Sequence, residues 1–164
     1  MYRSITVEVG FCYGHRLTDY VGKCACLHGH QGTVQVAIAS RRLNEAGMVF
    51  DFGVIKGFVK GWVDENWDHR VILNKADPIV AAIRPHDAGL HPVPYNPTAE
   101  NLAAQLYRAT EDWLSTLPED ENPSGADLIS VKFWETPTSS VTCYGDGVAS
   151  EGVLCGQEEG RAQG

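Results

Sequence analysis

The sequence lacks long hydrophobic runs, since no stretch approaches the roughly 18 apolar residues that a membrane-spanning helix needs. Positive charge is also scarce: 13 lysines and arginines stand against 21 acidic residues, for a net charge of −8. General nucleic-acid binding needs a basic surface, so we exclude that class. The five cysteines are an odd number, which argues against a closed disulfide framework. A small anionic substrate stays compatible with this composition, because a few local cations can bind phosphate.

What the sequence does contain suits one soluble globular domain. Its 164 residues are 43% hydrophobic and 21% charged, which is an ordinary balance for such a domain. We assign residues 1–147 to the domain and expect residues 148–164, rich in Gly, Glu and Gln, to be a flexible tail. The first ten residues, MYRSITVEVG, alternate like a strand and do not resemble a signal peptide. We therefore expect a cytoplasmic protein.

Hydrophobic periodicity predicts both strands and helices. Apolar residues at helical spacing predict one helix over residues 53–66 and a second that begins near Thr98, which suits an N-cap. The proline-rich stretch 76–97 is predicted to be a long loop. Alternating patterns predict four strands, over residues 2–13, 28–38, 127–135 and 140–146.

The predicted element order is strand, strand, helix, helix, strand, strand. This order indicates an α+β fold, with a four-stranded antiparallel sheet and both helices on one face. Such a sheet leaves two exposed edges, which readily pair with other chains. An oligomer that joins these edges into a barrel would remove both of them.

Three histidines form the clearest candidate for a metal site. His28 and His30 lie two residues apart at the start of the second predicted strand, so their side chains share a face. His15 closes the first strand, and a hairpin would bring it beside the other two. Three neutral imidazoles suit a catalytic zinc ion with an open fourth position. Any one of them alone could be an ordinary surface or core residue, but the combination favours zinc.

A cysteine near these histidines is a candidate base. Cys24 lies four residues before His28 and follows Lys23, and a nearby cation favours the reactive thiolate. The alternative is that Cys24 ligates zinc or is merely structural. Cys26 is a rival in the same loop, and the spacing does not choose between the two thiols.

Further acid–base candidates lie in two other segments. Asp68 and His69 are an adjacent acid and imidazole, suited to a proton relay or simply to the end of a helix. Glu135 ends an otherwise apolar strand face, where a carboxylate needs a partner. Its two acceptor oxygens suit the N–H edge of a guanidine-like heterocycle. The alternative is that the strand ends early and Glu135 is solvated.

Six segments in the same order resemble the 6-pyruvoyl-tetrahydropterin synthase and 6-carboxy-tetrahydropterin synthase family. FCYGHRL resembles the family's F-S-A-A-H-R-L, KCACLHGH its C-x-x-x-H-G-H, and MVFDFGVIK its M-V-x-D-F-x-x-L-K. WDHRVILN resembles L-D-H-x-x-L-N, NPTAENLA resembles P-T-x-E-N-L-A, and FWETPTSSVTCY resembles V-x-E-T-x-x-x-x-A-x-Y. The match runs from about Val7 to Tyr144, and six ordered motifs are specific where H-G-H alone would not be.

The resemblance implies a fold, an assembly and a metal. The fold is the tunnelling fold (T-fold), in which subunits pair edge to edge into a barrel. The assembly is a homohexamer, usually a dimer of trimers. The implied ligands of a zinc ion are His15, His28 and His30.

The resemblance also implies roles for the remaining candidates. Cys24 is the implied general base, and Asp68 with His69 completes the proton-transfer set. Glu135 is the implied anchor for the pterin ring. Thr98 matches a position near the pterin pocket, although its role as an N-cap accounts for it equally well.

The substrate implied by the resemblance is 7,8-dihydroneopterin triphosphate, with zinc holding its side-chain hydroxyls. Cys24 and His69 would move protons on opposite faces of that side chain, and triphosphate would leave by elimination. In the carboxy-forming branch a two-carbon fragment also leaves, as acetaldehyde, and the product enters 7-deazaguanine synthesis, including queuosine. In the pyruvoyl branch the side chain is retained for tetrahydrobiopterin.

The short C-x-x-x-H-G-H spacing resembles the carboxy-forming branch, so we predict a lyase with 6-carboxy-5,6,7,8-tetrahydropterin synthase activity. A pyruvoyl-forming enzyme is the second candidate, and a zinc- or pterin-binding homologue without activity is the third. A purely structural zinc protein is a further alternative. The departures from the family pattern are Cys12, Tyr13 and Gly14 before His15, the second thiol at Cys26, and Gln31 after H-G-H. Tyr13 is bulky and should lie close to the metal, where it would reshape the pocket.

Overall fold

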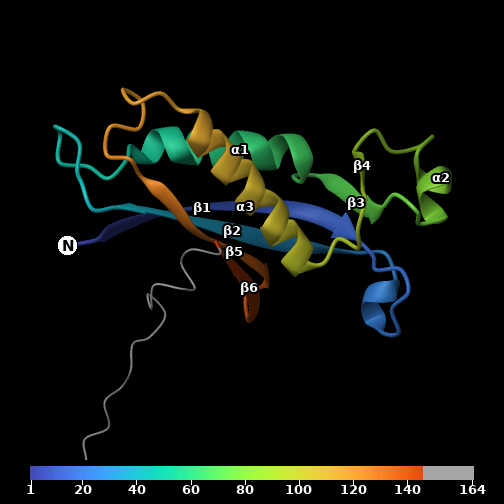
Figure 1. Cartoon of the computed structure of the whole chain (residues 1–164). Helices are drawn as coiled ribbons and strands as arrows, with labels where there is room; N and C mark the ends of the chain where they lie inside the picture. Colours follow the sequence, from blue (N-terminus) through green and yellow to red (C-terminus); the bar gives the residue numbers. More distant parts are fainter. Residues whose placement is uncertain (146–164) are drawn as a thin grey trace, which may run out of the picture.

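A computed structural model describes residues 1–145 of the chain (Figure 1). The predicted tail, and the last two residues of the predicted domain, lie outside the described residues. In chain order the elements are β1 (Arg3–His15), the 3-10 turn η1 (Lys23–Ala25), β2 (His28–Ser40), α1 (Phe52–Asn66), β3 (Arg70–Asn74), α2 (Ile79–Ile83), β4 (Leu90–Val93), α3 (Ala99–Thr116), β5 (Asp127–Thr136) and β6 (Ser139–Tyr144).

The two longest strands form the hairpin that the alternating pattern predicts. β1 and β2 pair antiparallel along their full length, from Arg3 opposite Ser40 to His15 opposite His28. β2 pairs antiparallel with β5, and β5 with β6. All four predicted strands are therefore present, at nearly the predicted positions.

The prediction that the sheet has only these four antiparallel strands is wrong. The sheet is mixed and has six strands in the order β4-β3-β1-β2-β5-β6, because β3 pairs parallel with β1 and β4 pairs parallel with β3. Both added strands are too short, at 5 and 4 residues, to show a clear alternating pattern. Parallel pairing also joins segments that are far apart in sequence, which local periodicity does not detect.

The predicted long loop over residues 76–97 is wrong for the same reason, since it contains α2 and β4. Pro92 lies inside β4 and pairs with Leu73 of β3. A proline is tolerated there because an edge strand has one side without ladder partners, where the missing N–H costs no hydrogen bond.

The two long helices, α1 and α3, lie on the same side of the sheet (Figure 1). Each begins at a side-chain cap: Asp51 accepts from the Gly53 amide, and Thr98 accepts from the Asn101 amide. Among residues 1–145, no helix is both long enough and apolar enough to cross a bilayer. The buried helix residues that face the sheet are Ile55, Val59 and Val63 of α1, and Leu102, Leu106 and Leu114 of α3.

Loop contacts close the end of the sheet where β1 finishes and β2 begins. The Leu17 amide donates to the Cys24 carbonyl at 2.8 Å, which folds the connection between the two strands back on itself. The Asn96 side chain accepts from the Thr18 amide at 2.9 Å and donates to the Thr18 carbonyl at 2.8 Å. These bonds tie the segment before α3 to the end of β1, and the histidines lie at this junction.

Candidate metal centre and its surroundings

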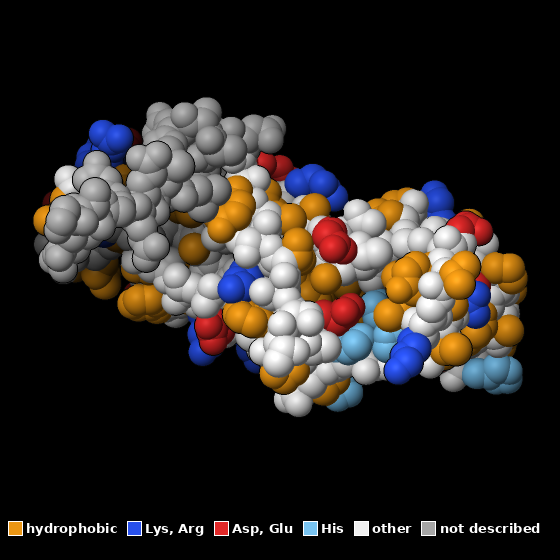
Figure 2. Space-filling model, turned by 90° about the horizontal axis from the view of Figure 1, so that it is seen from below, with side chains coloured by type: hydrophobic (Ala, Val, Ile, Leu, Met, Phe, Trp, Pro, Cys, Tyr) orange, Lys and Arg blue, Asp and Glu red, His pale blue; other side chains and the backbone are white. Residues whose placement is uncertain are grey.

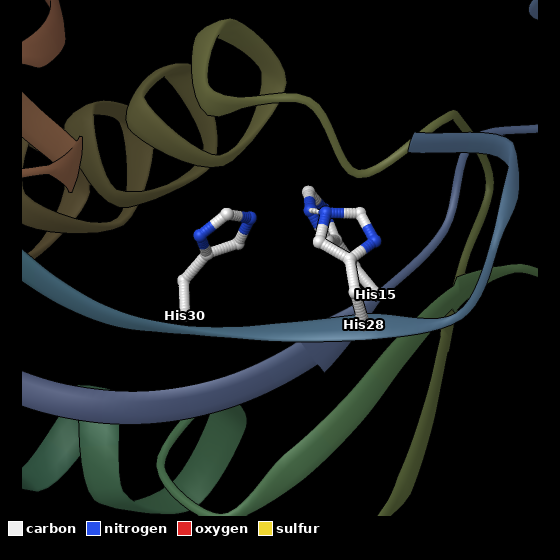
Figure 3. Close-up of side chains that lie close together, drawn as sticks. All are labelled: His15, His28 and His30. Carbon is white, nitrogen blue, oxygen red and sulfur yellow. Dashed lines mark hydrogen bonds between the residues drawn. The ribbon is translucent and has the colours of Figure 1, made fainter. Parts of the chain in front are cut away.

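The β1–β2 register brings the three predicted histidines together. His15 ends β1, while His28 and His30 begin β2, and all three imidazoles lie on the same side of the hairpin (Figure 3). One ring nitrogen from each lies within 4.8 Å of the others. His15 is only 1% exposed, and the other two are partly buried. The predicted proximity is confirmed, and the cluster could bind a metal ion.

Two backbone carbonyls set the proton positions in this cluster. His15 Nδ1 lies 2.7 Å from the Pro97 carbonyl oxygen, and His28 Nδ1 lies 2.7 Å from the Cys26 carbonyl oxygen. A carbonyl oxygen can only accept, so each Nδ1 carries the proton and donates it. In the neutral imidazoles each Nε2 then keeps a free lone pair, which is the form that ligates metal.

The positions of the Nε2 atoms fit a metal ion. The Nε2 atoms of His15 and His28 are 3.1 Å apart, close to the roughly 3.3 Å between neighbouring nitrogens of a tetrahedral zinc site with bonds of about 2.0–2.1 Å. Two lone pairs facing each other at this distance repel, and a cation bound between them would relieve the repulsion. His30 Nε2 is also buried without a hydrogen-bond partner, so all three nitrogens are available as ligands.

Burial keeps two of these histidines neutral. It lowers the pKa of His15 and of His30 below the ordinary histidine value, although the nearby Glu135 carboxylate opposes this. A neutral imidazole is the protonation state that metal binding requires.

Glu135 and Tyr13 lie against the histidine cluster. The Tyr13 hydroxyl donates to Glu135 Oε1 at 3.4 Å. The same oxygen lies 3.6 Å from His15 Nε2 and 3.8 Å from His30 Nε2. Burial, and then the Glu135 charge, raise the pKa of Tyr13 above its ordinary value, so the phenol stays a donor at neutral pH. The prediction that Tyr13 lies close to the metal face is confirmed.

Glu135 also lines a pocket of about 650 Å³ together with His30. Viewed from below, the surface shows histidine side chains next to acidic side chains (Figure 2). Most of the other residues that line the pocket are neighbours of His30 on β2 or of Glu135 on β5. Neighbouring residues of a strand point to opposite faces, so these side chains lie on the face of the sheet that α1 and α3 do not cover. They include Gln31, Thr33 and Trp134. A flat heterocycle that reached Glu135 through this pocket would come close to the histidines.

The two cysteines of the β1–β2 connection have different surroundings. Cys24 lies in η1 and is partly buried, whereas Cys26 is exposed. Cys26 contributes its carbonyl to His28, which does not depend on its thiol. The Cys24 thiol lies near enough to Tyr13 to influence the phenol electrostatically.

Asp68 and His69 follow α1 and are attached to β1 at Cys12. Asp68 Oδ1 accepts from the Cys12 amide at 2.9 Å, and the His69 amide donates to the Cys12 carbonyl at 2.7 Å. Asp68 Oδ2 lies 3.0 Å from His69 Nδ1, so the two side chains pair as predicted. The His69 side chain is 81% exposed, and within residues 1–145 no hydrogen bond or ion pair joins it to the three histidines.

Thr98 is the N-cap of α3, as predicted. Its hydroxyl accepts from the Asn101 amide, and the preceding Pro97 provides the carbonyl that holds His15. The contacts of the Pro97 and Cys26 carbonyls were not predictable from the sequence, because a backbone acceptor leaves no signature in residue type. The ion pair between Arg16 and the buried Asp77, at 2.9 Å, was also not predicted, because Asp77 lies outside the family motifs.

Comparison with known proteins shows which family this chain matches. Residues 4–146 match the family described as 6-pyruvoyl tetrahydropterin synthase. The 6-carboxy-5,6,7,8-tetrahydropterin synthase of Rickettsia bellii is 36% identical over 138 residues, covering 83% of this chain and 96% of that protein. The enzyme of the same name from Haemophilus influenzae is 32% identical over 144 residues, covering 83% and 94%.

Solved structures show the same fold. An uncharacterized protein from Wolinella succinogenes superposes with a TM-score of 0.75 at 28% identity, covering 89% of this chain and 99% of that one. The 6-pyruvoyl tetrahydropterin synthase of Caenorhabditis elegans gives a TM-score of 0.60 at 23% identity, covering 88% and 96%. The predicted α+β class and the T-fold of the single chain are therefore confirmed, the edge-to-edge barrel stays a prediction, and this chain belongs to the 6-pyruvoyl tetrahydropterin synthase family.

Proposed function

We propose that this protein converts 7,8-dihydroneopterin triphosphate into 6-carboxy-5,6,7,8-tetrahydropterin with the help of a zinc ion. The observation that carries the proposal is the His15–His28–His30 cluster with the Glu135 carboxylate against it. The relatives named 6-carboxy-5,6,7,8-tetrahydropterin synthase support the choice of this reaction. The C-x-x-x-H-G-H spacing supports the carboxy-forming branch as well.

Zinc is the ion we propose for the three histidines. Its preference for neutral imidazoles and an open fourth position matches three available Nε2 atoms. Bound there, zinc would act as a Lewis acid on oxygens of the substrate side chain. The Pro97 and Cys26 carbonyls support this role, because they orient His15 and His28 before the metal arrives.

Glu135 orients the substrate in this proposal. Its carboxylate accepts hydrogen bonds from the guanidine-like N–H edge of the pterin ring, a pairing that favours two parallel bonds. Because Glu135 lines the pocket and also faces His15 and His30, a ring held there places its side chain toward the metal. Thr98 supports the site mainly as the N-cap of α3.

Proton transfer falls to Cys24 and to the Asp68–His69 pair. Cys24 removes a proton from the substrate side chain as its general base, and Asp68 holds His69 by its Nδ1 so that Nε2 can exchange a proton. Within residues 1–145 the exposed His69 side chain has no hydrogen bond or ion pair with the three histidines. We therefore place it in the site of a neighbouring subunit, in a homohexamer formed as a dimer of trimers.

Mass analysis of the product tests the proposed function. Zinc-loaded protein incubated with 7,8-dihydroneopterin triphosphate should release triphosphate and acetaldehyde and yield the carboxy-pterin. A pyruvoyl-pterin would instead establish the second reaction. Unchanged substrate, with zinc and pterin both bound, would identify a non-catalytic homologue. Unfolding on chelation, with no pterin binding, would identify a structural zinc protein.

A further inference from the structure

The side chain of Tyr13 differs from what the family motif places beside the metal. The motif has alanine where this chain has Tyr13, between Phe11 and His15. The Tyr13 ring is 4% exposed, with ring centroids 5.5 Å from Phe11, 5.2 Å from His15 and 5.7 Å from His30. The ring is thus built into the packing that supports two of the histidines.

The Tyr13 hydroxyl has a partner on another strand. It donates to Glu135 Oε1, which belongs to β5 and lies 122 residues away in sequence. Oε1 is also the oxygen that faces His15 and His30. These three contacts all use Oε1, so Oε2 takes no part in them. A carboxylate held through one oxygen has fewer accessible orientations than a free glutamate at the mouth of a pocket.

We propose that Tyr13 is a positioning residue that fixes the Glu135 carboxylate for the N–H edge of a 2-amino-4-oxopteridine ring. The inference rests on the proposed function, because it takes Glu135 as the anchor of the pterin. Tyr13 acts through Glu135 and does not touch the reacting atoms. Its hydroxyl occupies one lone pair of Oε1, and the remaining lone pairs of the carboxylate stay available for two parallel bonds to the heterocycle.

This arrangement predicts that two related heterocycles, pterin and lumazine, bind with different affinities. Pterin presents two N–H donors to a fixed carboxylate, namely its 2-amino group and the ring N3–H. Lumazine has the same ring system with an oxygen in place of the 2-amino group, so it offers one donor and one repelling acceptor. A positioned Glu135 therefore prefers pterin to lumazine, whereas a loose carboxylate distinguishes them less well.

The test is the affinity of Tyr13→Phe for pterin and for lumazine, both followed by their intrinsic fluorescence on the zinc-loaded full chain. The substitution keeps the ring packing and removes the hydroxyl. We expect pterin affinity to fall about three- to tenfold, the size of one lost hydrogen bond, with lumazine affinity and zinc affinity unchanged. Tyr144→Phe, which removes the hydroxyl of an exposed tyrosine, is the matched control and should change none of the three.

Several outcomes would overturn the inference. Equal losses for pterin and lumazine, or a parallel loss of zinc affinity, would mean that Tyr13 only supports the packing. Unchanged or tighter pterin binding would mean that its hydroxyl does not help Glu135. Absence of pterin binding by the unsubstituted protein would remove Glu135 as the anchor. Because none of these readouts needs turnover, they are independent of the product analysis that tests the proposed function.

Discussion

At the scale of single residues, each candidate ligand depends on atoms that have no catalytic role. His15 is oriented by the Pro97 carbonyl, and His28 by the Cys26 carbonyl. His30 has no such bond at its Nε2 and packs against Tyr13 instead. His15 and His28 are thus oriented without a metal, which would lower the entropic cost of binding one.

Removal of one ligand should abolish tight metal binding. We expect His30→Ala to weaken zinc binding by at least about a hundredfold, beyond the 10- to 100-fold typical of outer-shell substitutions. His86→Ala removes an exposed histidine of the α2–β4 connection and serves as the matched control. Competition with a chelating dye measures both affinities. Equal affinity of the two variants would contradict the assignment of His30 as a ligand.

At the scale of secondary-structure elements, helix ends and strand ends hold the site together. Only the N-cap Thr98 separates Pro97 from the start of α3 at Ala99, so the cap of this helix and the orientation of His15 share a short segment. The chain after α1 is attached to β1 through the Cys12 backbone, which fixes where Asp68 and His69 lie. A change at either helix end therefore reaches the site through the backbone.

The cap of α3 can be separated from a role in pterin binding. Thr98→Ala should lower the free energy of unfolding by about 1 kcal/mol, the usual effect of losing an N-cap. Thr98→Ser keeps a capping hydroxyl and should restore most of that loss. Urea denaturation measures both variants. Full stability of Thr98→Ala, combined with weaker pterin binding, would favour the pterin pocket over the cap as the reason for this threonine.

The Asp68 carboxylate should make stability depend on pH. The hydrogen bond from the Cys12 amide, and then the His69 contacts, lower the pKa of Asp68 below its ordinary value of 3.8. A carboxyl group whose pKa is lowered in the folded state stabilises the protein at pH values above its ordinary pKa. That contribution is lost as the pH falls through the lowered pKa.

We therefore expect Asp68→Asn to lower the free energy of unfolding by about 1 kcal/mol at pH 7, and to cost less at pH 3. Urea denaturation of the metal-free protein at both pH values measures the difference. Asp120→Asn, at an exposed position, is the matched control and should have little effect at either pH. A difference that does not change with pH would show that the Asp68 charge contributes nothing.

At the scale of the whole molecule, the residues proposed for proton transfer lie in separate segments of the described chain. Cys24 lies in the η1 turn between β1 and β2, while His69 is exposed beside β1 and joined to Cys12 through its backbone. The sheet also ends at β4 on one edge and β6 on the other. Pairing of such edges between copies is a direct way to close the sheet and bring two sets of residues together.

A mixing experiment tests this assembly. Cys24→Ala and His69→Ala should each be inactive in the proposed reaction, and a co-expressed mixture should regain about a quarter of the activity if each site takes one residue from each neighbour in a symmetric ring. A mixture of Cys26→Ala with His69→Ala is the control, because it shows whether Cys26, instead of Cys24, is the thiol that the reaction needs. No recovery in the first mixture would place both residues in one subunit.

The β1–β2 hairpin, the two long helices and the histidine cluster were predictable from the sequence alone. All three depend on local rules: alternation places His28 and His30 on one face, the connection over residues 16–27 returns β2 onto β1, and helical spacing marks α1 and α3. Four of the six family motifs lie in these segments, and the other two lie at β3 and at β5–β6. The family resemblance therefore predicted the fold class from the sequence.

Only the tertiary structure decided the features that join distant segments. The parallel pairing of β3 and β4, the Pro97 carbonyl on His15, the Cys12 bonds that hold Asp68, and the Tyr13 hydroxyl on Glu135 all cross long stretches of chain. Such contacts depend on how the elements pack, and several use backbone atoms that every residue shares. The sequence by itself determined which histidine side chains share a face of the hairpin, and packing decided what orients them. The reason is that periodicity encodes the face of a strand on which a residue lies, but not the residue's neighbours in other elements.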